Sequence, residues 1–318
     1  MLKNKTSKLL TSKQKKAFFI TGIVIISTFI VISTSIDIVS SKNRLILATT
    51  TSTYDSGLLD YLLPVFEENF GIIVDVLSVG TGQALKTARR GDVDVLLVHS
   101  RVREDEFIAN GYGIHRVCIM YNNFIIIGPV SDPAHIKGEN ITITMTNLKS
   151  AGEAGLIKFY SRGDYSGTHS KELSLWALID FDPKPGSDQW YLETGSGMGN
   201  TLIIADENNG YSLIDRGTWL SATDISLILL IEGDKLLINP YGAIIVNPET
   251  LLTVKYDLAL NFVGFLTSKK GQDLIGAYRK NNETLFFPSF GHCNEIHGCP
   301  TTDIEVEFWK EYNGGYSG

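Results

Sequence analysis

After its first 43 residues the chain alternates short apolar runs with amphipathic stretches, and this alternation constrains its fold more than any other feature. Residues 44–50, 72–80 and 93–100 are predicted to be strands, because they are rich in Val, Ile and Leu over strand lengths. Residues 56–70 and 83–91 carry apolar side chains at helical spacing. Strands that alternate with helices in this way are typical of a parallel α/β architecture.

The same alternation continues over residues 126–235, and further helices are predicted over 256–267 and 271–280. Two apolar segments, 117–129 and 238–248, are each long enough to run from one lobe to another. With 318 residues, 43% of them hydrophobic, the chain can bury one large core or two ordinary ones. The predicted organisation is a leader over 1–40, a first lobe over 44–122 plus 240–290, a second lobe over 123–239, and a tail over 291–318.

The leader has six lysines among its first 16 residues, followed by an uncharged apolar run over residues 17–36. Twenty such residues are about the length that a helix needs to cross a bilayer core of roughly 30 Å. Because flanking lysines stay on the cytoplasmic side, we expect the rest of the chain to be extracytoplasmic. It is either anchored to the cell membrane by this helix or secreted after cleavage of a signal peptide, and the sequence leaves both open. Asn140 and Asn282 each begin a glycosylation acceptor pattern, whose use is also undecided.

Residues 41–318 are acidic, with 22 basic and 34 acidic side chains. An acidic body argues against a nucleic-acid partner, because phosphate backbones are bound by basic surfaces. For the same reason, an anionic ligand would have to be held by a local array of hydrogen-bond donors and not by the net charge.

The cysteines fit an exported protein. Cys293 and Cys299 lie close together in the tail and are expected to form a disulfide in an oxidising compartment. A tetrahedral metal site that includes His292 and His297 is the alternative, and the disulfide is favoured over it, so no metal is predicted. Cys118 lies in an apolar run and is expected to be an ordinary small core residue.

Small, hydroxylated or glycine-rich residues recur at four predicted strand-to-helix turns, over 49–53, 80–83, 161–168 and 195–200. Backbone N–H groups at the start of a helix favour an anion, glycine lets the backbone approach a ligand closely, and hydroxyls donate further hydrogen bonds. In open α/β sheets such turns gather where ligands bind. Ordinary helix capping explains any one of them, but four turns together with Arg162 predict an anion site.

Several longer motifs contain these turns, among them ATTTSTYDSGLLDYLLPVFEE, VGTGQALKTARRGDVDVLLVH, SRGDYSGTHSKELSLW, WYLETGSGMGNTL and NPYGAIIVNP. In this order they resemble the tungstate-binding proteins of bacterial and archaeal ABC importers, and the resemblance extends from about residue 45 to 290. It implies the type II periplasmic-binding-protein fold, in which two α/β lobes joined by crossing hinge strands close on one oxyanion. It also implies a protein that is not an enzyme, needs no cofactor, and delivers its anion to an ABC permease and its ATPase. We expect a monomer.

The resemblance further implies which residues hold the anion. The implied oxyanion-binding residues are Thr50, Thr51, Ser52, Thr81, Gly82, Arg162, Ser166, Gly167 and Thr168, with Asp164, His99, Gly199 and Asn200 in supporting positions. Arg162 supplies charge and a planar fork of donors. Asp164, two residues further on, is expected to pair with Arg162 and orient it.

The chemistry of the ligand favours tungstate or molybdate, which carry no proton at neutral pH and therefore only accept hydrogen bonds. Phosphate-binding proteins share the Arg-x-Asp-x-Ser-Gly-Thr pattern and are the main rival class. They keep a carboxylate that accepts the proton of monohydrogen phosphate, whereas this sequence has His99 and Ser100 at that place. A ligand sensor remains a further alternative. A hydrolase of phosphate esters is less favoured, because no nucleophile motif is present. Because tungstate and molybdate are dianions of nearly equal size, the sequence does not indicate which of them is preferred.

Overall fold

The computed structural model describes residues 43–315. Contacts divide the chain into residues 1–44 and 45–318, and the elements below belong to the second unit apart from the first residue of β1. Between residues 43 and 315 no helix combines the length and the apolar character that a membrane crossing requires. The segment predicted to cross a membrane, 17–36, lies outside the described residues.

Lobe 1 is built on a sheet in which the strands lie in the order β12-β4-β9-β3-β1-β2. Its strands are β1 (Arg44–Thr49), β2 (Ile73–Ser78), β3 (Val95–Val98), β4 (Gly113–Gly128), β9 (Ile238–Val246) and β12 (Phe287–Pro288). Its helices are α2 (Thr51–Asp55), α3 (Leu58–Phe70), α4 (Thr81–Ala88), α5 (Arg101–Ala109), α10 (Tyr256–Thr267), α11 (Lys269–Ala277) and α12 (Asp303–Tyr312). Strand β3 is parallel to β1 and antiparallel to β9.

The sheet of lobe 1 is buried on both faces. In β3 the four residues are fully buried and alternate: Val95 and Leu97 face a core formed with α3, α10, α11 and α12, whereas Leu96 and Val98 face one formed with α4 and α5. A strand covered on both faces is expected to read as a continuous apolar run, which is how β3 was recognisable in the sequence.

Lobe 2 is built on the second half of β4, which pairs antiparallel with β7 and β8, and on the parallel pair β5–β6. Its strands are β5 (Phe159–Ser161), β6 (Tyr191–Glu193), β7 (Ser212–Asp215) and β8 (Ile228–Ile231). Its helices are α6 (Ile141–Glu153), α7 (Gly167–Trp176), α8 (Met198–Glu207) and α9 (Arg216–Ser221), with short 3-10 turns at Ala177–Ile179 and Lys235–Leu237. The lobe has cores of its own, and Trp176 is its largest fully buried side chain.

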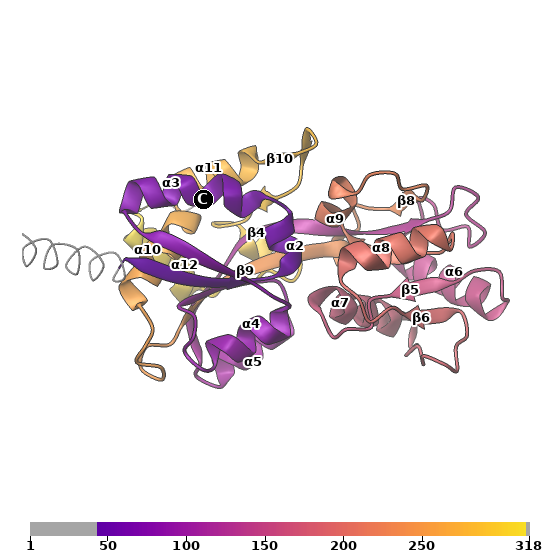
Figure 1. Cartoon of the computed structure of the whole chain (residues 1–318), viewed down its shortest axis with the longest axis horizontal. Coiled ribbons are helices and arrows are strands. Elements are labelled where there is room, and N and C mark those ends of the chain that lie inside the picture. The colour runs from indigo at the N-terminus through magenta and orange to yellow at the C-terminus, as the bar shows by residue number, and fades with distance from the viewer. Residues whose placement is uncertain (1–42, 316–318) are drawn as a thin grey trace, which may run out of the picture. The chain divides into compact units, whose positions relative to one another are not determined.

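Two strands, β4 and β9, join the lobes (Figure 1). They pair with each other from Gly113 opposite Val246 to Asn123 opposite Ile238. The 16 residues of β4 continue into lobe 2, where Phe124 to Gly128 pair with β7 and β8. At about 3.3 Å per residue, a strand of this length is long enough to serve two sheets. The molecule therefore consists of two α/β lobes connected by crossing strands.

The tail, which the sequence left unplaced, packs on lobe 1. After the short hairpin β10 (Arg279–Lys280) and β11 (Glu283–Thr284), the chain passes through a 3-10 turn at Cys293–Glu295 into α12. Trp309 of α12 is fully buried in the core that contains α3 and α10. The tail is thus part of the hydrophobic core of lobe 1.

The predicted disulfide between Cys293 and Cys299 is wrong, because Cys299 is bonded to Cys118 of β4, 181 residues away. The tail folds back over the sheet and brings the Cα atoms of these two residues to 5.8 Å, within the range that a disulfide spans. Cys293 is a buried thiol that donates to the carbonyls of Cys118 (3.1 Å) and Ser289 (2.9 Å). The interpretation of Cys118 as an ordinary core residue was therefore also wrong.

Candidate oxyanion site

The four segments selected from the sequence all lie between the end of a strand and the start of a helix. Thr50 caps α2 after β1, Gly80 precedes α4 after β2, Ser166 caps α7 after β5, and Gly197 precedes α8 after β6. Two boundaries differ from the prediction, because α2 begins at Thr51 and α4 at Thr81, each inside its motif. The long helix α3 follows α2 as a separate element. Each lobe contributes two of the four helix starts.

In lobe 1 the side chains of Thr50 and Thr53 are buried, whereas Ser52 is half-buried and Thr51 is exposed. The Thr50 hydroxyl lies 2.6 Å from that of Thr53 and 3.2 Å from that of Ser52. Thr81, the first residue of α4, is 1% exposed, and its hydroxyl has no hydrogen-bond partner within residues 43–315. A buried polar atom without a partner costs free energy unless a ligand or water satisfies it.

In lobe 2 the predicted pair of Arg162 and Asp164 is present as an ion pair. The other Asp164 oxygen accepts a hydrogen bond from the backbone N–H of Ser166 at 3.1 Å. Burial alone would raise the pKa of Asp164, but the bonds from Ser166 and the charge of Arg162 outweigh it and lower that pKa below its ordinary value. Asp164 therefore stays ionised and holds the guanidinium in place. The Nε atom of Arg162 is buried and has no hydrogen-bond partner in the described part of the chain.

His99 brings the two lobes into contact at this point. It follows β3 of lobe 1, and its ring lies so close to Gly167, the first residue of α7, that a Cβ atom there would be 3.0 Å from Cε1. Burial lowers the pKa of His99 to about 4; the hydrogen bond to Asn239 opposes this effect and the Arg162 charge adds to it. The ring is therefore neutral at pH 7.

A buried polar network behind His99 connects the site to the crossing strands. Asn122 of β4 donates to the Asp215 carboxylate at 2.8 Å, and Asn239 of β9 donates to the Asn122 carbonyl oxygen at 2.8 Å. The remaining side-chain oxygen of Asn239 faces His99 Nδ1 at 3.1 Å, so Nδ1 is the donor in that pair. The ring also packs on Tyr241, with centroids 4.9 Å apart. Sequence reasoning missed this network, although MYNNF and INPYG had been recognised as crossing segments.

A second histidine, His169 of α7, lies on the lobe 2 side. Its Nδ1 accepts a hydrogen bond from the backbone of Tyr165 at 3.1 Å, and its buried Nε2 has no hydrogen-bond partner, with the Glu193 carboxylate 3.7 Å away. Burial lowers the pKa of His169, Glu193 and Asp164 oppose that shift, and the charges of Arg162 and Arg103 add to it. Arg103, on α5 of lobe 1, was also missed by sequence reasoning.

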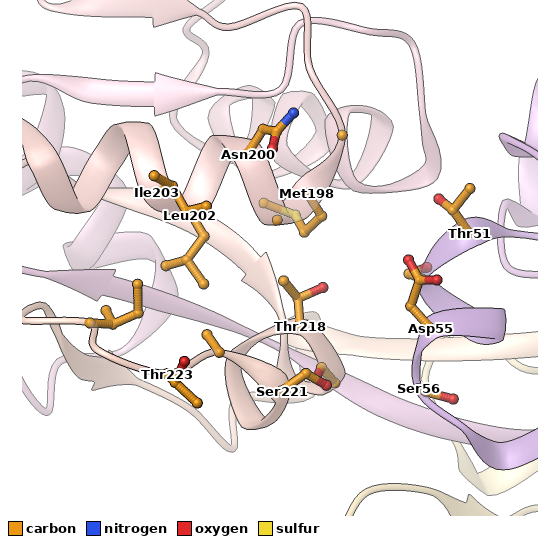
Figure 2. A pocket seen from close by; sticks show the side chains of 16 residues that line it. Thr51, Asp55, Ser56, Met198, Asn200, Leu202, Ile203, Thr218, Ser221 and Thr223 are labelled. Carbon is orange, nitrogen blue, oxygen red and sulfur yellow. The ribbon is translucent and has the colours of Figure 1, made fainter.

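A cleft of about 610 Å³ is lined by residues of both lobes, and most of these buried groups do not line it. Figure 2 shows Thr51, Asp55 and Ser56 on one side, facing Met198 and Thr218 on the other. Of the predicted residues, Thr51, Ser52, Gly199 and Asn200 line this cleft. The more buried donors, Thr81, Arg162 and Thr168, do not. The cleft is lined by hydroxyl groups as well as apolar side chains and contains the acid Asp55, whereas the buried donors combine hydrogen-bond donors with the charge of Arg162.

Another titratable group lies deeper in lobe 2. Glu172 of α7 accepts hydrogen bonds from the Tyr191 hydroxyl at 2.7 Å and from the Trp176 indole at 3.2 Å. Burial raises the pKa of Glu172 to about 7, against the opposing effect of these hydrogen bonds. The group is a structural carboxyl that shares a helix with the site.

The fold and the donors at the lobe interface define a class, the bilobed binding proteins, and the comparisons agree. Residues 34–270 match the model of the PBP superfamily domain. The tungstate-binding protein TupA of Peptoclostridium acidaminophilum is 46% identical over 252 residues, which are 78% of this chain and 87% of that protein. The predicted fold class is confirmed by these matches and by the solved structures described next.

Two solved structures give the same result. The tungstate-binding protein TupA from Desulfovibrio alaskensis G20 superimposes with a TM-score of 0.69 at 43% identity, covering 77% of this chain and 98% of that one. The tungstate ABC transporter protein from Geobacter sulfurreducens superimposes with a TM-score of 0.67 at 46% identity, covering 74% and 98%. The chain belongs to the PBP superfamily and, within it, to the family of the TupA tungstate-binding proteins.

Proposed function

We propose that this chain is an extracytoplasmic solute-binding protein that captures tungstate, or molybdate as the second choice, and delivers it to an ABC importer. One observation carries the proposal beyond the family relationship: Arg162 Nε and the Thr81 hydroxyl, which come from opposite lobes, are buried donors without partners. Unmatched donors suit a ligand that only accepts hydrogen bonds. A fully deprotonated tetrahedral dianion is such a ligand.

The proposed contacts are those inferred from the sequence. The oxyanion-binding residues are Thr50, Thr51, Ser52, Thr81, Gly82, Arg162, Ser166, Gly167 and Thr168, with Gly199 and Asn200 as further contacts. Asp164 orients Arg162. We assign His99 a positioning role, because its Nδ1 is engaged with Asn239 and its ring is packed between Tyr241 and the start of α7.

In the proposed cycle, a first lobe (44–122 plus 240–290) and a second lobe (123–239) close around the anion by bending at β4 and β9, as hinged binding proteins do. The closed, loaded form, acting as a monomer, then docks on the ABC permease and its ATPase. No bond of the ligand is made or broken, so the protein acts as a carrier and not as an enzyme, and the anion is its cargo and not a cofactor. Residues 17–36 would hold the protein at the external face of the cell membrane, unless this segment is cleaved.

The proposal is tested by competition calorimetry of the full chain with tungstate, molybdate, sulfate and phosphate. Tungstate should bind most tightly, and Arg162→Ala should abolish tight binding while thermal unfolding changes little. Arg90→Ala is the matched control, because Arg90 pairs with Asp92 on the surface and lies outside the proposed site. Phosphate as the tightest ligand would favour the phosphate-binding alternative. Unchanged tungstate affinity in Arg162→Ala would contradict the site assignment.

A further inference from the structure

Arg103 differs from the other arginines between residues 43 and 315. Six of them form ion pairs with carboxylates: Arg89, Arg90, Arg101, Arg116, Arg162 and Arg216. Arg279 donates to two backbone carbonyls, and Arg44 also has a partner. Arg103 is half-buried and has no ion pair or hydrogen bond among the described residues. A guanidinium that gives up part of its hydration without a counter-charge is unfavourable unless something else compensates it.

The position of Arg103 increases the free-energy cost of its unpaired charge. It lies in the first turn of α5, and its Nη1 atom is 3.4 Å from the place where a Cβ atom on Gly82 would lie, in the first turn of α4. The N-terminal ends of helices carry partial positive charge, so they favour anions and disfavour cations. Two helix starts and one guanidinium therefore place like charges together. Next to Gly82, the buried Thr81 hydroxyl is a donor without a partner.

A positively charged side chain of lobe 2 also acts on this region. The charges of Arg103 and Arg162, which come from different lobes, both lower the pKa of His169. The charge of Arg162 is already balanced by Asp164. His99 is neutral at pH 7, and the pKa of His169 is lowered. Among these groups, Arg103 is the one whose positive charge no carboxylate balances.

We propose that Arg103 is a second cationic residue of the oxyanion site and gives it a preference for divalent over monovalent oxyanions. The inference rests on the proposed function. A dianion held by the Arg162–Asp164 pair alone would have donors but no net compensating charge. Arg103 supplies that charge, and the bound anion in turn relieves the repulsion between Arg103 and the starts of α4 and α5. Because Coulomb energy scales with the product of the charges, a dianion gains about twice as much from Arg103 as a monoanion of the same size.

The test compares tungstate with perrhenate, a tetrahedral oxyanion of nearly the same size that carries one negative charge. Affinities are measured by calorimetry on the full chain for wild type, Arg103→Gln, Arg103→Lys and Arg90→Gln. Arg90→Gln is the matched control, since it removes the same charge from lobe 1 at a side chain that is 52% exposed and paired with Asp92. Arg103→Gln should weaken tungstate binding by about tenfold or more and perrhenate binding by a clearly smaller factor. Arg103→Lys should keep most of the preference, and Arg90→Gln should keep both affinities.

The outcomes separate this inference from the proposed function. Equal losses for the two anions in Arg103→Gln, or no loss for either, would overturn the role of Arg103 while leaving tungstate binding in place. Impaired docking on the permease with unchanged anion affinity would likewise overturn it. A wild-type chain that binds neither anion would overturn the proposed function and this inference together.

Discussion

The contact between His99 and Gly167 offers a direct test of how the two lobes meet. Replacing Gly167 with Ala puts a Cβ atom 3.0 Å from His99 Cε1, 3.1 Å from Nδ1 and 3.4 Å from the His99 carbonyl oxygen. Comfortable carbon contacts lie at about 3.5–4.0 Å, so the neighbours must move by a few tenths of an ångström. The ring has little freedom to do so, because Nδ1 is bonded to Asn239 and the ring packs on Tyr241.

The size of the effect follows from this geometry. Adding a methyl group to a packed contact usually costs about 1–3 kcal/mol. Because the two residues belong to different lobes, opening the lobes relieves the clash, so the cost falls on the closed arrangement and not on folding. Calorimetry should therefore show tungstate affinity lowered by roughly 5- to 150-fold. Urea unfolding should change by less than about 1 kcal/mol, since Ala suits a helix at least as well as Gly.

Two further variants keep this prediction sharp. Gly276→Ala in α11 is the matched control, because its Cβ atom would meet nothing closer than Pro288 at 3.4 Å, and it should bind like wild type. In a His99→Ala background the clash disappears, so Gly167→Ala should then cost little more. Wild-type affinity in Gly167→Ala, or the same loss with and without the His99 ring, would refute the reasoning that this contact belongs to the closed state.

Two other predictions concern stability. Cys299→Ser should lower the free energy of unfolding by about 2–5 kcal/mol, because the Cys118–Cys299 bond closes a long loop, whereas Cys293→Ser should have a smaller effect in urea unfolding under oxidising conditions. Equal losses in the two variants would instead indicate that Cys293 takes part in the bond. For Glu172, the folded-state pKa of about 7 lies above the ordinary value of 4.5, so its stabilising contribution is complete below pH 4.5 and is lost as the pH rises through 7. Between pH 5 and 8 the wild type should lose about 2–3 kcal/mol relative to Glu172→Gln, and a pH-independent difference in urea unfolding would contradict this assignment.

Much of the fold could be predicted from local sequence patterns. The burial of β3 on both faces was readable from VDVLLVHS, and the helical spacing of α3 from LLDYLLPVFEENF, because each depends on side chains a few positions apart. The starts of α7 and α8 were readable for the same reason, since capping residues act within one helical turn, whereas α4 begins two residues before the predicted helix. Even so, the first helix starts inside its motif, at Thr51, because the Thr50 side chain caps it where Ser56 had been expected to begin a helix.

Contacts between distant parts of the chain were not predictable in this way. Cys118 lies 181 residues from Cys299, and no spacing rule distinguishes that pair from the nearby Cys293. Trp309 entered the core of lobe 1 from a tail whose polar composition indicated nothing of the kind. Nothing in the sequence distinguished Arg103 from the other arginines until the structure placed it beside Gly82.

The sequence by itself therefore determined the α/β class, the family and the segments that carry donors, because periodicity, capping and motifs are local properties of the chain. Only the tertiary structure decided how those donors meet: His99 against Gly167, the network from Asn122 to Asn239 along the crossing strands, and the ion pair that neutralises Arg162 while Arg103 stays unbalanced. The physical reason is that the affinity of an acidic protein for an anion depends on distances of a few ångströms between groups from two lobes. Those distances are set by packing across the whole chain.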